Sequence, residues 1–464
     1  IHPERALGQP PLRVAPGERD PVELFIRAPG RRQRCCDLAD LGVAIRIVGE
    51  VEPAGRDEQL LAGVGLITFV TGTAVAWLVT MCQFPLRGIL TWASLVPMAM
   101  PGYIVAYAYV DFLSFAGPLQ TWLRAVFGWR RPDDYWFPEI RSLGGAIAVL
   151  AMVLYPYVYL TARASFMRQP ATQLEVARAL GQTPWGAFRR VALPLARPGI
   201  AVGVSLALME CLNDIGAAGF FGVRTLTLGV YTTWLSQGNL GGAAQISAVM
   251  LIFIFALVWV ERQARRQQSF VLPSQRPRQP DRVRLSGWRA AAAVAVCLTP
   301  ILVGFAIPAL VLLSFAMSRL EDAMSLPYLK AVSHSLILAS LAAVVAVVLG
   351  LILGYANRLT RDGFTRRVIR LSSMGYAIPG TVLGIGVLIP LAGFDNALDS
   401  FMRDRFNVST GLLLSGSIAA IIFAYVARFL AVSFGAIESG LHVEGQHLAN
   451  LGELLEKQNR LGLP

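Results

Sequence analysis

Nine long apolar windows constrain this chain more than any other feature of its sequence. They lie near residues 60–81, 88–113, 143–166, 199–222, 239–260, 290–314, 336–356, 371–391 and 412–434. A helix needs about 20 mostly apolar residues to cross the bilayer core, which is about 30 Å thick. The whole chain is 55% hydrophobic and only 15% charged, which is unlike a soluble domain. We therefore expect an all-α, multi-pass bundle of transmembrane helices.

The basic residues predict an orientation for these helices. Loops 168–198, 261–289 and 357–370 carry net charges of +4, +6 and +4, whereas 315–335 and 392–411 are close to zero and −1. Arginine and lysine collect in the cytoplasmic loops of membrane proteins. We expect the three basic loops to be cytoplasmic, and the net charge of +12 then reflects topology. We expect membrane lipid to be a partner of the chain, and we expect no nucleic-acid partner.

Several classes of function find no support in the sequence. The five cysteines, Cys35, Cys36, Cys82, Cys211 and Cys297, form no C-x-x-C pair, so neither a metal site nor a disulfide framework is predicted. There is no G-x-x-x-x-G-K-[ST] phosphate loop and no nucleophile motif. We expect no catalytic residues and no cofactor. Residues 1–58 mix arginines, acids, proline and glycine without periodicity, which predicts an irregular N-terminal segment.

An internal repeat organises the rest of the chain. The stretch "SLVPMAMPGYIVAYAYV" at 94–110 resembles "SSMGYAIPGTVLGIGVLIP" at 372–390, and Pro101 and Pro379 are 278 residues apart. Similar helices precede both stretches, and similar polar segments follow them. The order and the predicted orientation are the same, so we expect two parallel halves, 59–260 and 290–464. The basic segment 261–289 would join them on the cytoplasmic side.

The polar segment 168–198 predicts a helix–turn–helix beside the membrane. Thr172 followed by Glu175 is a capping-box pattern, so a short helix is expected to begin there. Gly181 suits a left-handed helix end. Thr183 and Pro184 begin a second helix, with proline in its first turn, and we expect that helix to end at Leu193-Pro194.

One side of this predicted hairpin carries small residues. Ala177 and Gly181 would allow close approach of another protein chain. A loop that packs only on its own bundle is the alternative that these features leave open.

Polar residues also fall inside predicted membrane spans. Glu210, Asn213 and Asp214 are spaced at i, i+3 and i+4, which is one helix face. Ionisable groups at membrane depth are costly and usually face a partner or a wet cavity. They could line a translocation path or form a structural cluster near the rim, and two acids are not a metal site. Pro101 and Pro379 would mark bends facing the pore or simple packing kinks.

The segment at 175–194 resembles a known motif. It reads E-V-A at 175–177, then Gly181, then V-A-L-P at 191–194. This spacing is similar to the EAA loop of binding-protein-dependent ABC importer permeases, E-A-A-x3-G-x9-I-x-L-P. The resemblance implies that Glu175, Ala177, Gly181, Leu193 and Pro194 belong to a loop that docks on a separate cytoplasmic ATP-binding subunit. It also implies an inner-membrane location and an extracytoplasmic substrate-binding protein.

A closer resemblance is to the fused two-half ferric-iron permeases. It is carried by "YWFPEIRSLGGA" at 135–146 and "LMECLNDIGAAGFFGVRTLTLGVYTTW" at 208–234. That family has six helices per half, so nine spans of an expected twelve are present, and the chain is expected to be an incomplete permease. In the second half the corresponding loop is degraded, with Gln446 at the glutamate position and Gly452 kept.

Ferric iron is therefore the expected cargo. Thiamine, a polyamine or sulfate remain alternatives, as do a secondary transporter and a non-functional truncated permease. The external binding protein largely sets the cargo in this class, so the sequence of the permease leaves these alternatives open.

Overall fold

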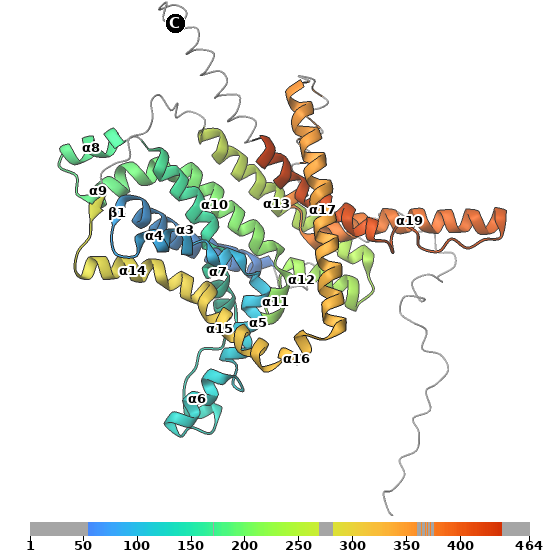
Figure 1. Cartoon of the computed structure of the whole chain (residues 1–464), viewed down its shortest axis with the longest axis horizontal. Coiled ribbons are helices and arrows are strands. Elements are labelled where there is room, and N and C mark those ends of the chain that lie inside the picture. Colours follow the sequence, from blue (N-terminus) through green and yellow to red (C-terminus); the bar gives the residue numbers. More distant parts are fainter. Residues whose placement is uncertain are drawn as a thin grey trace, which may run out of the picture. The chain divides into compact units, whose positions relative to one another are not determined.

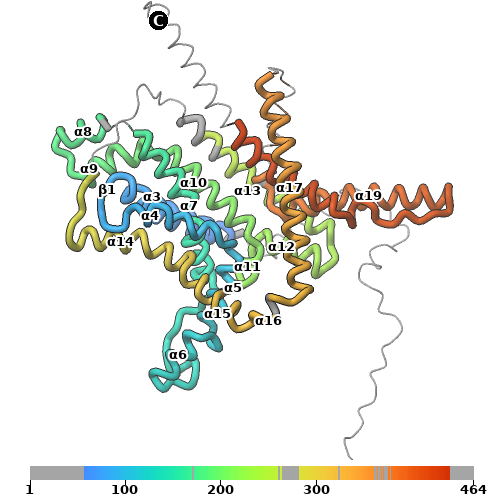
Figure 2. The backbone as a smooth tube through the Cα atoms, viewed as in Figure 1, coloured from blue at the N-terminus to red at the C-terminus, as the bar shows by residue number. Residues whose placement is uncertain are grey.

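The computed structural model describes residues 54–169, 171–268, 282–359 and 375–438, with residues 363, 367, 369 and 372 (Figure 2). All of them belong to one compact unit, Val48–Pro464. Most of residues 1–58 lie outside the described part, so the prediction for that segment is tested only at its end. There it is wrong, because helix α3 begins at Ala54.

The described residues are almost entirely helical, as the apolar windows predict. Among the described residues, eight helices are long and apolar enough to span a membrane, or nine if one bent pair counts as a span. The eight are Asp57–Met81, Leu143–Arg168, Pro184–Asn213, Leu240–Trp259, Trp288–Ser318, Leu326–Leu359, Gly380–Phe406 and Ile418–Glu438. The bent pair joins Arg87–Ala99 to Gly102–Phe127 at an angle of 88°. The span Pro184–Asn213 begins and ends earlier than the predicted window 199–222.

Helices α3 (Ala54–Met81), α7 (Leu143–Arg168), α10 (Leu193–Asn213) and α13 (Leu240–Gln268) form the centre of the first half (Figure 1). α3 packs along α7, and α10 packs against α3, α7 and α13. Gly72 permits the close α3–α7 contact, because a Cβ there would come within 2.7 Å of Val158. Shorter elements complete this half: α4 (Arg87–Ala93), η1 (Val96–Ala99), α5 (Gly102–Leu113), α6 (Pro118–Phe127), η2 (Pro132–Asp134), α8 (Ala171–Ala179), α9 (Pro184–Ala187), η3 (Phe188–Ala192), α11 (Ile215–Phe221), α12 (Leu226–Tyr231) and η4 (Thr232–Ser236).

The proline–glycine stretches of the internal repeat adopt the same local structure. η1 precedes Pro101, and η6 (Gly375–Ala377) precedes Pro379. Each proline is the N-cap of the next helix, α5 or α19 (Gly380–Phe406), with ψ values of 137° and 144°. Proline fits an N-terminal helix position because it has no N–H to satisfy. Both prolines therefore break the helical path, as predicted.

The predicted linker 261–289 has regular secondary structure at both of its ends. α13 continues to Gln268, and Val283–Arg284 (β2) pairs in parallel with Cys82–Gln83 (β1). Helix α14 (Trp288–Ile301) then starts the second half. These are corrections to the predicted linker, and residues 269–281 lie outside the described part of the chain.

The second half begins by packing on the first. α14 contacts α3, α4 and α7, and α15 (Ile307–Ser318) contacts α5 (Figure 1). The hydroxyl of Tyr109 in α5 donates to the main-chain oxygen of Val303 in η5 (Leu302–Ala306) at 2.7 Å. α16 (Leu320–Ala323) leads into α17 (Leu326–Leu359), which contacts the helix Ile418–Glu438 through a hydrogen bond from Ser433 to the oxygen of Ala346.

Candidate coupling loop and intramembrane polar cluster

Helix α8 occupies the first part of the predicted helix–turn–helix. It runs from Ala171 to Ala179, so Thr172 lies inside its first turn. The predicted capping role of Thr172 with Glu175 is therefore wrong, because the helix has already begun at Ala171. Glu175 lies on the exposed side of α8.

The end of α8 confirms the predicted role of Gly181 in the local backbone. Gly181 has a φ of 82°, its N–H donates to the oxygen of Arg178 at 2.9 Å, and the N–H of Gln182 donates to the oxygen of Ala177 at 3.0 Å. These two bonds form a Schellman motif, which requires a left-handed residue and favours glycine. A Cβ at Gly181 would meet nothing within 4 Å. The φ angle, and not crowding within this chain, is what favours glycine there.

The second helix begins where the sequence predicts but does not end at Leu193-Pro194. The Thr183 hydroxyl accepts from the N–H of Gly186 at 3.1 Å, and Pro184 occupies the first turn. After α9 the chain forms one π-helical turn, η3, in which the N–H of Leu193 donates to the oxygen of Phe188. α10 follows without a break. The wider turn lets the helix absorb Pro194, which would interrupt a regular α-helix.

Side chains on opposite faces of α8 have different surroundings. Leu174 and Ala177 are buried in the chain's own core, which includes Phe188. Ala177 is 6% exposed, so its small side chain packs inward and is not part of a free docking face. The predicted small-residue face is corrected accordingly. Val176 and Leu180, which sequence reasoning did not single out, are 57% and 77% exposed.

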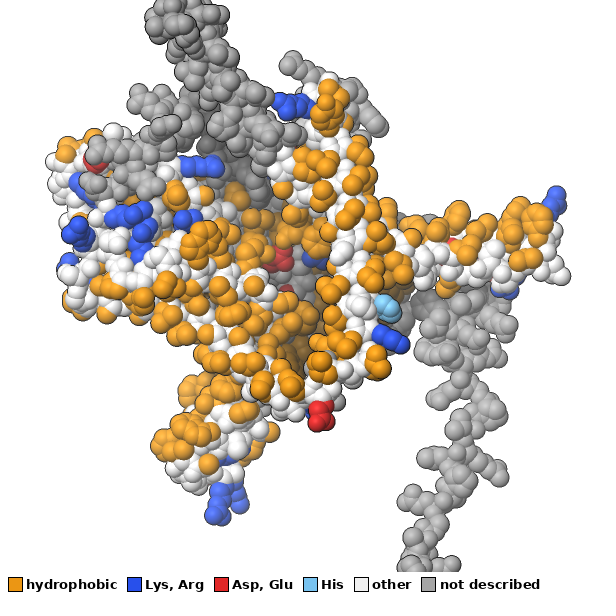
Figure 3. Space-filling view, viewed as in Figure 1, with side chains coloured by type: hydrophobic (Ala, Val, Ile, Leu, Met, Phe, Trp, Pro, Cys, Tyr) orange, Lys and Arg blue, Asp and Glu red, His pale blue; other side chains and the backbone are white. Residues whose placement is uncertain are grey.

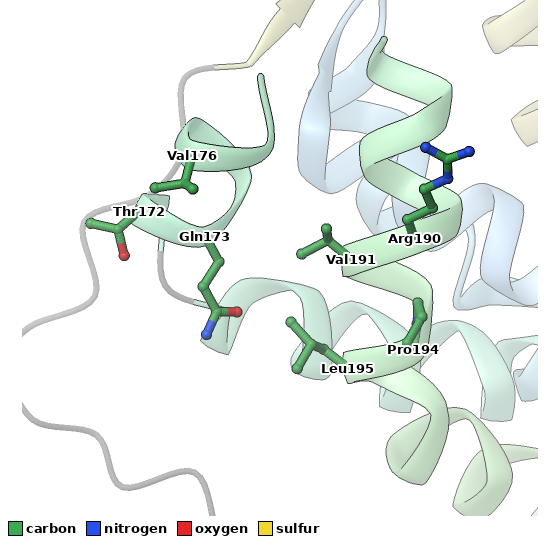
Figure 4. A pocket seen from close by; sticks show the side chains of 7 residues that line it. All are labelled: Thr172, Gln173, Val176, Arg190, Val191, Pro194 and Leu195. Atoms are coloured by element: carbon green, nitrogen blue, oxygen red, sulfur yellow. The ribbon is translucent and has the colours of Figure 1, made fainter. Parts of the chain in front are cut away.

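A groove lies between α8 and the start of α10. It has a volume of about 520 Å³ and is lined by Thr172, Gln173, Val176, Arg190, Val191, Pro194 and Leu195. Figure 4 shows Val176 and Gln173 on one side and Val191 and Leu195 on the other, pointing toward the space between the helices. The Arg190 guanidinium donates to Gln182 Oε1 at 3.0 Å. The hairpin thus presents an apolar groove beside basic side chains.

The hairpin is fixed to the rest of the bundle at its base. Gln169, directly after α7, is buried and donates through Nε2 to the oxygen of Ala192 at 2.8 Å. Phe188 contacts Trp77 of α3 with ring centroids 4.7 Å apart, and Trp185 packs on Phe188 at 5.2 Å. Movements of α8 and α9 would therefore be transmitted to α3 and α10.

The predicted polar face of α10 is only partly formed. Glu210 and Asn213 lie on α10, but the helix ends at Asn213, and Asp214 is the N-cap of α11. The Asp214 carboxylate accepts from the N–H of Ala217 at 2.9 Å. A capping side chain stabilises a helix start by about 1 kcal/mol. Asp214 therefore has a structural role, and it does not extend the face of Glu210.

Glu210 joins the two halves of the chain. Its carboxylate accepts a hydrogen bond from the hydroxyl of Tyr376, which lies in η6 three residues before Pro379. Tyr157 of α7 lies within electrostatic range of both side chains. Tyr376 was not singled out from the sequence, since an aromatic residue at the edge of an apolar window carries no distinct signal. Its position beside the repeated Pro-Gly stretch was the available clue.

The surroundings of Asn213 and Asp214 also bring separate segments together. Asn213 Oδ1 is buried without a hydrogen-bond partner among the described residues. A Cβ on Gly102 would collide with the Asp214 carboxylate, so the break at Pro101 lies beside this acid. Met209 and Leu212 pack with Val382, just after Pro379. The sequence-predicted path residues thus lie near one another, along the contact between the two halves.

A buried acid was missed by sequence reasoning. Asp57 is 5% exposed, and its carboxylate accepts from the N–H of Leu226 at 2.9 Å, where it supports the start of α12. The sequence assigned this position to an irregular segment, so no role was expected. Among the described residues no three His, Cys, Asp or Glu side chains group as metal ligands would. Gly452 and the second-half loop lie outside the described residues.

Comparison with known proteins finds a family model and several relatives that align with the first half of the chain. Residues 69–269 match the model described as "Binding-protein-dependent transport system inner membrane component". The molybdenum transport system permease protein ModB of Escherichia coli (strain K12) is 26% identical over 212 residues, which is 44% of this chain and 89% of the relative. The sulfate transport system permease protein CysW of the same strain is 29% identical over 215 residues, which is 44% of this chain and 71% of the relative.

A fused relative aligns over a longer region. The Fe(3+)-transport system permease protein FbpB 2 of Haemophilus influenzae is 21% identical over 388 residues, which is 83% of this chain and 69% of the relative. The relatives are permease components of ABC importers, and the apolar helices agree with a multi-pass inner-membrane location. Residues 69–269 therefore resemble the inner-membrane component of binding-protein-dependent transport systems, and the relatives that align with this chain are permeases.

Proposed function

We propose that this permease subunit imports ferric iron. The observation that carries the proposal is the extent of the match to FbpB 2, which covers 83% of this chain and so includes both halves. The matches to the molybdenum and sulfate permeases cover 44%, about one half. A chain that unites two halves in one polypeptide has the layout of the iron relative.

The coupling surface in this proposal is the hairpin α8–α9 with the groove beside it. Val176, Leu180 and Trp185 are large apolar side chains that are more than half exposed, next to a polar loop. Exposed apolar patches of this kind mark protein interfaces. The partner is a separate ATP-binding subunit, which hydrolyses ATP. Glu175 lies on the accessible side of α8, and Gly181 ends α8 in a left-handed turn. Leu193 and Pro194 lie at the start of α10, and Pro194 lines the groove.

The translocation path in this proposal follows the contact between the halves. Glu210 and Asn213 approach it from α10, while Pro101 and Pro379 break the helices that flank it. Broken helices are tolerated in membranes where they line a cavity or are covered by protein. An external substrate-binding protein would deliver the cargo.

An oxyanion is the second candidate cargo. The identity to the sulfate and molybdenum permeases, 29% and 26%, exceeds the 21% to FbpB 2. Substrate choice in this class lies largely with the external protein, so a test must include it.

The test is uptake by proteoliposomes that contain the full chain, the ATPase and the binding protein from the same cells. Radiolabelled ferric iron, molybdate and sulfate are offered separately, with and without ATP. ATP-dependent uptake of iron alone supports the proposal. Uptake of molybdate or sulfate instead would replace the cargo, and uptake that persists without the ATPase would indicate a secondary transporter. No uptake of any solute, with the chain folded, would support a non-functional permease.

A further inference from the structure

Helix α6 carries an apolar stripe that the chain does not cover. The i, i+3, i+4, i+7, i+8 spacing of an amphipathic helix holds for Leu119, Trp122, Leu123, Val126 and Phe127. Trp122, Val126 and Phe127 are nevertheless 59%, 56% and 59% exposed. Figure 3 shows hydrophobic side chains over the part of the molecule that carries α6. The apolar face of this helix therefore points outward.

The polar face of α6 is turned toward the chain itself. Gln120 is 7% exposed, its Nε2 donates to the oxygen of Leu113 at 2.7 Å, and its Oε1 accepts from the Tyr135 hydroxyl at 2.6 Å. The Arg124 guanidinium donates to the oxygen of Phe115 at 2.7 Å. A helix on the surface of a soluble protein has the opposite arrangement, with its polar face in water. The outward face of α6 is therefore suited to apolar surroundings.

The α6 loop, which we define as residues 114–142, holds this face in a fixed direction. The ring of Trp129 stacks with those of Phe127 and Tyr135, with centroids 4.7 Å apart in both pairs. A Cβ on Gly117 would lie 2.3 Å from the main-chain oxygen of Asp111, so α5 and α6 meet in a close turn. The direction of the stripe is therefore set relative to α5.

The neighbours of the α6 loop in the chain place it at a membrane surface. It follows α5, which belongs to the bent pair of apolar helices, and it precedes the span Leu143–Arg168. That span ends at the basic loop 168–198, so it begins on the opposite side of the membrane. The α6 loop is thus tied at both ends to membrane helices, on the side away from the arginine-rich loops.

The composition of the α6 loop favours lipid over a protein partner. Trp122, Trp129 and Trp136 all lie in it, and tryptophan is enriched at membrane–water interfaces. Trp136 is 87% exposed on a segment without regular secondary structure, which leaves its indole free to enter the bilayer surface. The loop contains four arginines and three acids, so it offers a charged protein surface little net charge.

We infer that α6 lies in the lipid headgroup region on the side away from the arginine-rich loops, with its apolar stripe toward the acyl chains. An interfacial helix buries its apolar face about 5–10 Å into the boundary between headgroups and acyl chains. Burial of apolar surface, and not lipid charge, drives this contact because the loop is nearly neutral. The close turn at Gly117 passes the contact on to α5, so α6 anchors the bent pair in the bilayer.

A spin label at position 126 tests the inference in the full chain, reconstituted in dioleoyl-phosphatidylcholine vesicles. The label is attached through p-acetylphenylalanine in place of Val126, so the native cysteines stay unlabelled. Position 121 is the matched control, because Thr121 is exposed on the polar side of the same helix. The depth of each label is measured by electron paramagnetic resonance, from its relaxation by oxygen and by a water-soluble nickel chelate present on both sides of the vesicle.

We expect the label at position 126 to lie about 5–10 Å below the lipid phosphates, and the label at position 121 to lie at or above them. Added phosphatidylglycerol should leave both depths unchanged, and a shift would overturn the charge-independent contact. Equal access of both labels to nickel, or a label at position 126 near the bilayer centre, would overturn the interfacial position. Access to nickel that disappears only when the substrate-binding protein is added would assign the stripe to that protein instead of lipid.

Thermal unfolding checks the fold of each labelled chain. If the label at position 126 lowers the unfolding temperature, position 127 takes its place, because Phe127 is exposed on the same stripe. The same depth is then expected, and nickel access equal to that at position 121 would contradict the inference.

Discussion

Substitution of Gly181 separates two explanations of why the hairpin needs glycine. Gly181 has a φ of 82°, and a Cβ there would meet nothing within 4 Å in this chain. The left-handed conformation costs a residue with a Cβ about 1–2 kcal/mol, and asparagine much less. Within this chain, therefore, alanine should disturb the end of α8 and asparagine should not.

The size of the effect follows if the ATPase binds only the native hairpin. A cost of about 1–2 kcal/mol corresponds to a loss in affinity of about 5-fold to 30-fold. Gly181→Ala should weaken ATPase binding by that factor. If the partner's backbone also approaches this position, Gly181→Asn should weaken binding too, although it preserves the helix end, and Gly181→Asp should abolish coupled ATP hydrolysis.

The assay is the Kd of the ATPase subunit for the full chain in detergent, measured by surface plasmon resonance. Gly128→Ala is the matched control, because Gly128 ends α6 with a φ of 72° and equally open surroundings, at the opposite end of α7 from the hairpin. Both alanine variants should lose similar stability, and only Gly181→Ala should lose affinity. If both variants bind the ATPase alike, the hairpin is not its docking site.

Three further predictions test orientation and the polar cluster. A cysteine that replaces Arg262 should not react with a membrane-impermeant maleimide in intact cells, whereas a cysteine that replaces Arg130 should react. Rapid labelling at position 262 would show that the predicted orientation is wrong. Asp214→Ala should lower the thermal stability by about 1 kcal/mol while Asp214→Asn, which still caps α11, should not; equal losses would contradict the cap. Tyr376→Phe and Glu210→Gln should show a coupling energy of about 1 kcal/mol in a double-mutant cycle of unfolding, and additivity would mean that the hydrogen bond joining the halves contributes nothing.

The sequence predicted the membrane spans because their signal is local. An apolar run of about 20 residues has no stable soluble alternative, so its position suffices. The first and last residues of the membrane helices were harder to predict. The window 199–222 was misplaced because the preceding helix was predicted to end at Leu193-Pro194, whereas the helix Pro184–Asn213 passes through Pro194 without a break. A π-helical turn is set by the surrounding packing, and the sequence carries no separate signal for it.

In the candidate coupling loop, too, the features set by the local sequence were predicted and those set by packing were not. The turn at Gly181 and the helix start at Thr183-Pro184 depend on neighbouring backbone atoms, and both were predicted correctly. Ala177 was assigned to an exposed face, because a small residue serves close packing equally well inward or outward. The buried cluster that contains Ala177 also contains Phe188, which belongs to a different helical segment, η3. Long-range packing of this kind cannot be read from helical periodicity.

The repeat relates the two halves in packing while their chemistry differs. Gly102 and Gly380 are 278 residues apart, and so are Leu150 and Arg428. A Cβ on Gly102 would meet Leu150 at 3.4 Å in addition to Asp214, and a Cβ on Gly380 would meet Arg428 at 2.8 Å. The backbone register is therefore kept, while a leucine in the first half is replaced by an arginine in the second. The Nε of Arg428 is buried without a hydrogen-bond partner among the described residues. Arg428 as a whole is partly exposed, and a cation in a membrane protein is costly unless it is compensated. The two halves therefore present different chemistry at equivalent positions of the repeat. If the translocation path proposed above follows the contact between the halves, Glu210 in the first half and Arg428 beside Gly380 in the second would give its two sides opposite charge, although the fold that builds them repeats.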